Sequence, residues 1–224
     1  MENNNSVIKT NENITCSIVH IFGLLISSFI FILMLEIANV FGNIKGYVLI
    51  YSFSITVILY YLTSIVYHFL SEKKESKAVA ILHFTNASFF FLTIPATLST
   101  ICLLDSSGIK GTVILIISIV FSVAAIVFTI VKGLAKSKII SFIFVLLAEI
   151  PLYFFSISIV KNISWVCLLL LGIGTVLKIV GLLFYGSRKT FTHVFWHIFF
   201  VFAESLQSLS IMTFILPKLF NVQV

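Results

Sequence analysis

The feature that most constrains this chain is a succession of long apolar runs separated by short polar breaks. Seven runs can be delimited, near residues 16–40, 47–70, 78–104, 110–131, 139–160, 163–186 and 191–216. A helix that crosses the hydrocarbon core of a bilayer needs roughly 20 apolar residues, and strands of a membrane barrel would instead be alternating segments of about ten residues. The pattern therefore predicts an all-α integral membrane protein with seven transmembrane helices.

Composition supports this class. Of the 224 residues, 60% are hydrophobic and only 10% are charged, whereas soluble domains carry about 25% charged residues. A separate soluble catalytic domain is therefore excluded. We predict a disordered N-terminus over residues 1–14, a membrane domain over residues 15–217 and a short external tail over residues 218–224.

The basic residues predict an orientation, because Lys and Arg concentrate on the cytoplasmic side of membrane proteins. With the N-terminus inside, nine of the 14 basic residues fall on inner segments and four on outer ones, and Lys178 lies within a span. This distribution predicts a cytoplasmic N-terminus and an external C-terminus. The net charge of +6 is spread over short loops, so membrane lipid is the expected partner and nucleic acid is not.

Three histidines are expected at one depth in the bilayer. His193 and His197 are four residues apart at the start of the last run, and His68 is near the end of the second. The i, i+4 spacing puts the first two on one helix face, and three imidazoles are a common ligand set of catalytic Zn²⁺. From spacing alone, a zinc site and three separately hydrogen-bonded core histidines both stay open.

Other polar residues within the runs have structural interpretations. Glu149 and Lys178 are expected at similar depths in adjacent spans, which predicts an interhelical ion pair. Glu204 lies two turns beyond His197 and is interpreted as a hydrogen-bonded core residue, or else as a carboxylate near the histidines. The three cysteines show no CxxC spacing, so we interpret them as small packing residues.

Several short motifs in order carry a family resemblance. They are "VHIFG" (Val19–Gly23), "SIVYH" (Ser64–His68), "FTNASFFFLTIPATLS" (Phe84–Ser99) and "GLLFYGSRKTFTHVFWH", which ends at His197. With them the chain resembles the hemolysin III family of the progestin and adipoQ receptor superfamily of seven-helix membrane proteins. The resemblance extends over nearly the whole chain, and it implies a bacterial plasma membrane as the location.

The resemblance implies Zn²⁺ bound by His68, His193 and His197, with the Ser64 hydroxyl facing water at the metal. Relatives in the wider superfamily suggest metal-dependent hydrolysis of a lipid amide or ester. The chain departs from the family pattern at Thr85, where an aspartate is usual, and at Asn86, where a histidine is usual. Threonine can orient a water molecule but cannot act as a base near neutral pH.

Two functions therefore stay open at this point. The first is a zinc-dependent membrane hydrolase acting on a lipid-like substrate, with Ser64 and Thr85 orienting the water. The second is a non-catalytic cytolytic or ligand-sensing membrane protein in which zinc is structural. Substrate identity and oligomeric state do not follow from the sequence.

Overall fold

The computed structural model describes residues 2–41, 44–71, 76–102, 108–132, 140, 143–150, 164–185 and 191–219, and all regular structure among them is helical. The elements with defined bounds are α1 (Glu2–Phe41), α2 (Ile44–Ser71), α3 (Lys77–Cys102), α4 (Gly108–Lys132), α6 (Trp165–Tyr185), α7 (Thr192–Ser210), the π-helical segment η4 (Ile211–Ile215) and α8 (Leu216–Leu219). Residues 143–150, between α4 and α6 in the chain, are also helical.

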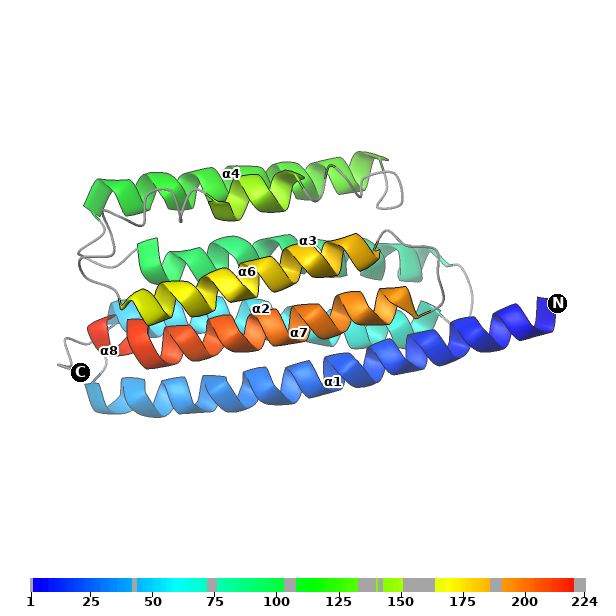
Figure 1. The fold of residues 1–224 in the computed structure, drawn as a ribbon, viewed down its shortest axis with the longest axis horizontal. Helices are drawn as coiled ribbons and strands as arrows, with labels where there is room; N and C mark the ends of the chain where they lie inside the picture. Colours follow the sequence, from blue (N-terminus) through cyan, green and yellow to red (C-terminus); the bar gives the residue numbers. More distant parts are fainter. Residues whose placement is uncertain are drawn as a thin grey trace.

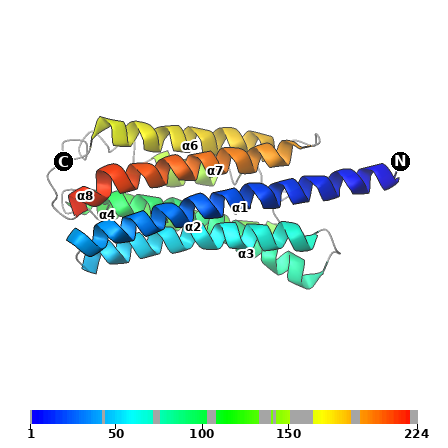
Figure 2. The ribbon, with the colours of Figure 1, turned by 90° about the horizontal axis from the view of Figure 1, so that it is seen from below.

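The long helices lie lengthwise beside one another (Figure 1). Neighbours in sequence pack together, as α1 does with α2, α2 with α3 and α3 with α4, and α6 packs with α7. In addition α7 packs against α1, so the first helix and the last long helix are adjacent (Figure 2). This contact brings residues from the two ends of the chain to one place.

Six of the described helices are long and apolar enough to cross a membrane. The first of these spans begins at Lys9 and the last ends at Lys218. Their outer faces carry large apolar side chains, as on α1, where Phe22, Leu25 and Phe29 are each about 60% exposed. Such a surface is stable in lipid and not in water. The expected fifth span, residues 139–160, falls largely outside the described residues.

The N-terminal segment is part of the first helix. Helix α1 includes Glu2 and extends past the ends of its neighbours (Figure 1). Polar side chains support this part of the helix, since the Thr15 hydroxyl donates to the Asn11 carbonyl at 2.7 Å. Asn13 also contacts the end of α2, at His68. The disorder expected from composition over residues 1–14 stays a prediction.

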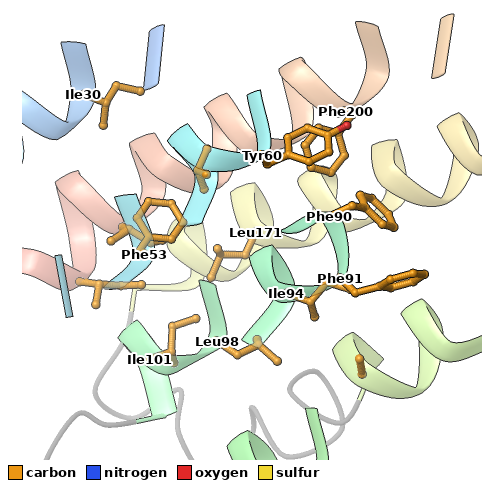
Figure 3. Packing of buried hydrophobic residues seen from close by; sticks show 14 of the residues in the cluster. Ile30, Phe53, Tyr60, Phe90, Phe91, Ile94, Leu98, Ile101, Leu171 and Phe200 are labelled. Atoms are coloured by element: carbon orange, nitrogen blue, oxygen red, sulfur yellow. The ribbon is translucent and has the colours of Figure 1, made fainter. Parts of the chain in front are cut away.

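Aromatic and aliphatic side chains pack together in the core of the bundle (Figure 3). The ring of Phe200 on α7 lies 4.5 Å from that of Tyr60 on α2 and 5.3 Å from that of Phe90 on α3. Helices α6 and α7 also approach each other closely at Gly174. A Cβ atom added to this glycine would lie only 3.0 Å from the Ala203 carbonyl oxygen. Small residues permit this close approach, which is how membrane helices associate without a hydrophobic driving force between them.

Candidate metal centre

The three histidines expected at one depth meet side by side. His68 comes from the last turn of α2, and His193 and His197 come from the first two turns of α7. The Nε2 atom of His197 lies 3.1 Å from Nε2 of His68 and 3.0 Å from Nε2 of His193. His68 and His197 are almost fully buried, and His193 is half-buried.

Hydrogen bonds alone satisfy this arrangement poorly. The Asn13 Oδ1 atom lies 3.3 Å from His68 Nδ1, and because an amide oxygen only accepts, the imidazole proton belongs on Nδ1. The Nε2 atom of His68 then presents a lone pair to the cluster. A neutral imidazole nitrogen either donates or accepts, so the His197 Nε2 atom cannot bond well to both neighbours. A cation at the centre would receive all three lone pairs, and the donor set therefore fits a metal ion.

Cys16 belongs to the same group. Its thiol sulfur and one nitrogen from each of His68, His193 and His197 all lie within 4.8 Å of one another. Cys16 is fully buried on α1, in agreement with its interpretation as a packing residue. Its distance from the histidines also makes it a candidate metal ligand. Sequence reasoning missed this position because it searched for paired cysteines, whereas the available signal was the spacing of four between Cys16 and His20.

His20 lies beside this group, one turn after Cys16. Its ring centroid is 4.3 Å from that of His197, and the side chain is fully buried. Among the described residues neither ring nitrogen of His20 has a hydrogen-bond partner. Helix α1 therefore presents a thiol and an imidazole to the place where α2 and α7 present three imidazoles.

The two residues expected to orient water lie in different surroundings. Ser64 is fully buried and donates a hydrogen bond of 2.6 Å to Asn86 Oδ1. Thr85 instead donates to the carbonyl of Ile81 on its own helix, at 2.9 Å. Asn86, the next residue, lines the cavity beside the histidines, and Thr85 is absent from that lining. The structure thus brings Ser64 and Asn86 together, and it does not bring Thr85 to the cavity.

A cavity of about 130 Å³ adjoins the histidines. Its walls are mainly aromatic and apolar, and they comprise Tyr60, Tyr67, His68, His83, Asn86, Ala87, Phe90, Phe91, Leu182, Tyr185, His193, Trp196 and His197. A protein cavity of about 150 Å³ can hold benzene, so this space fits part of an apolar molecule. A mainly apolar lining with a few polar groups is typical of small-molecule binding sites.

A second polar cluster lies deeper in the bundle. The Lys178 ammonium contacts Glu149 Oε1 at 3.3 Å, which confirms the ion pair predicted from the sequence. It also contacts Glu204 Oε1 at 2.8 Å, a partner that the sequence did not indicate. Lys178 is 5.8 Å from the ring centroid of Phe200. Both carboxylates are therefore paired with the lysine. The group of possible metal ligands around Cys16 contains no carboxylate.

These features define a class: a helical membrane protein with a buried group of histidine and cysteine side chains that could hold a metal ion. Residues 8–208 match a family model described as haemolysin-III related, so the chain belongs to this family. The resemblance recognised from short motifs is confirmed by this match. Searches of curated proteins and of solved structures gave no significant match.

Proposed function

We propose that this haemolysin-III related membrane protein binds Zn²⁺ through His68, His193 and His197. The observation that carries the proposal is the approach of three imidazole Nε2 atoms to 3.0 and 3.1 Å within a buried site. Zn–N bonds of about 2.0–2.1 Å in a tetrahedral shell place ligand nitrogens about 3.3 Å apart. The observed separations are within a few tenths of an ångström of this value.

We further propose that the site serves hydrolysis of an acyl-lipid amide or ester. A zinc ion held there supplies Lewis-acid activation of water and of a carbonyl group. Asn13 fixes the orientation of the His68 ring, and the apolar cavity beside the histidines receives part of an acyl chain. Asn86, which lines the cavity and accepts a hydrogen bond from Ser64, is better placed than Thr85 to orient a polar group at the cavity wall.

The test combines metal content with turnover in purified full-length protein. Wild type is expected to contain about one zinc per chain and to release fatty acid from ceramide-like lipids. His68→Ala should lose the metal, and His193→Ala should lose hydrolysis by at least about 100-fold because a ligand is missing. His83→Ala is the matched control for metal content, and it should keep its zinc because His83 is outside the ligand group.

The metal site and the hydrolase activity would be contradicted by different results. Wild-type protein without zinc, prepared without chelators, contradicts the metal site. Zinc-loaded wild type that cleaves nothing on a broad panel of acyl lipids contradicts the hydrolase while leaving the metal site intact.

A second function is favoured by one observation. The group offers four possible protein ligands, one of them a thiol, and a closed shell of four protein ligands that includes cysteine is typical of structural rather than catalytic zinc sites. In this alternative the metal joins α2 to α7, and the role of the protein is cytolytic or ligand-sensing. The distinction rests on turnover and on the effect of metal removal on stability.

We also propose seven spans, a cytoplasmic N-terminus and a plasma-membrane location. Helices α4 and α6 run in the same direction (Figure 1), and helical residues 143–150 lie between them in the chain, which supports one more crossing. The test fuses each of two reporters to each terminus in turn. Green fluorescent protein fluoresces only in the cytoplasm, and alkaline phosphatase is active only outside it. Fluorescence at the N-terminus and phosphatase activity at the C-terminus are expected, whereas six spans would give the same reading at both ends.

A further inference from the structure

Two helices present reactive side chains to the metal centre at the same spacing. On α7 the pair is His193 and His197, and on α1 it is Cys16 and His20, each four residues apart. Because residues at this spacing share a helix face and α1 packs against both α2 and α7, the face of α1 that carries Cys16 meets the histidines. The Cys16 sulfur lies within 4.8 Å of a ligand nitrogen from each of the three histidines.

Three histidine ligands leave one position of a tetrahedral zinc shell open. With a Zn–S bond of about 2.3 Å and Zn–N bonds of about 2.0–2.1 Å, a tetrahedral sulfur would lie about 3.5 Å from each nitrogen. Since no separation within the group exceeds 4.8 Å, a contraction of at most about 1.3 Å closes the shell. Helix α1 packs against both α2 and α7, and its Cys16 sulfur is close enough to take the position that the histidines leave open.

Charge favours a thiolate in this position. Neutral imidazoles leave the full double charge of Zn²⁺ in a buried intramembrane site, where an uncompensated charge is costly. The ligand group contains no carboxylate, and the Cys16 thiol is its only side chain that becomes anionic on coordination. Soft thiolate ligands also favour zinc over hard cations such as Mg²⁺. A role in packing alone would not require the sulfur to face three imidazole nitrogens.

We propose that Cys16 is the fourth metal ligand, so that the resting site is a closed Cys–His₃ shell formed by α1, α2 and α7. On binding, the thiol loses its proton to solvent as the metal–sulfur bond forms, and one proton is released per metal bound at this residue. Cys16 bound to a metal would occupy the position that a catalytic zinc site keeps open for water or substrate. This inference rests on the proposed histidine site and specifies its fourth ligand.

The first test uses Co²⁺ in place of zinc, because cobalt bound to a thiolate shows strong near-ultraviolet charge-transfer absorption. Full-length protein in detergent, stripped of metal and titrated with Co²⁺, should develop this band at one equivalent. Cys16→Ser should still bind cobalt but without the band, and with an affinity lower by about tenfold or more. Cys102→Ser makes the same change at a buried cysteine on α3 and should keep the band.

The second measurement needs no variant, so it holds even if Cys16→Ser fails to fold. X-ray absorption at the zinc edge of wild type should show one sulfur at about 2.3 Å. Metal binding with only nitrogen and oxygen neighbours, and without a charge-transfer band, overturns the role of Cys16 but leaves the histidine site standing. Failure of wild type to bind either metal overturns both proposals.

Discussion

Lys178→Met is expected to lower the free energy of unfolding by about 3–5 kcal/mol, the range found when one member of a buried charge network is removed. The reason is that Glu149 and Glu204 both contact the Lys178 ammonium, and all three side chains are almost fully buried. Without the lysine, two carboxylates face each other with no positive charge between them. The measurement is thermal or denaturant unfolding of purified protein in detergent.

The matched control is Lys110→Met, which removes the same charge from an exposed position at the start of α4. It should change stability by less than about 0.5 kcal/mol. Adding Glu204→Gln to Lys178→Met should recover part of the loss, because one of the two uncompensated carboxylates is then neutral. A Lys178→Met protein as stable as the control would mean that the contacts with Glu149 and Glu204 contribute nothing to the fold.

His197→Ala is expected to have the largest effect on metal binding. His197 is the central member of the cluster, since its Nε2 atom contacts the Nε2 atoms of both His68 and His193. Loss of a ligand should lower affinity by at least about 100-fold, more than the 10–100-fold that follows removal of an outer hydrogen-bond partner. The measurement is zinc content after dialysis against a competing chelator.

Thermal unfolding of the same proteins distinguishes a structural metal from a dispensable one. If zinc joins α2 to α7, a chelator should lower the melting temperature of wild type, because a ligand that binds only the folded state stabilises it. His197→Ala should melt at one temperature with and without the chelator. Phe195→Ala, a half-exposed neighbour on α7, should respond like wild type. A melting temperature of wild type that the chelator leaves unchanged would contradict the structural role.

Much of the helical architecture could be predicted from the sequence, because hydropathy over about 20 residues is a strong signal. The meeting of His68 with His193 and His197 also followed from depth, since each lies at a known distance from the end of a span. Depth does not specify which helices are neighbours or which faces meet. That is why the approach of α1, with Cys16 and Asn13, was not predicted.

The same limit explains the polar residues. Glu149 and Lys178 could be paired because their expected depths agree, and the structure confirms the pair. Glu204, interpreted first as a hydrogen-bonded core residue, is fully buried and contacts Lys178 on α6, a partner that its spacing from His197 did not indicate. Thr85 was singled out by its place in a motif, yet its neighbour Asn86 is the residue at the cavity. Successive residues on a helix point in directions about 100° apart. A sequence motif alone does not show which of two neighbouring residues faces the cavity.

The contacts that α7 makes with α1 and with His68 on α2 have a consequence for biosynthesis. His68 and His197 are separated by 129 positions in the chain, and helices of membrane proteins insert before they associate. The metal centre therefore does not exist until the ribosome has made the last long helix and that helix has entered the bilayer. A chain truncated before Thr192 contains most of the membrane domain but lacks two of the three histidines, so a bound metal would mark completed molecules.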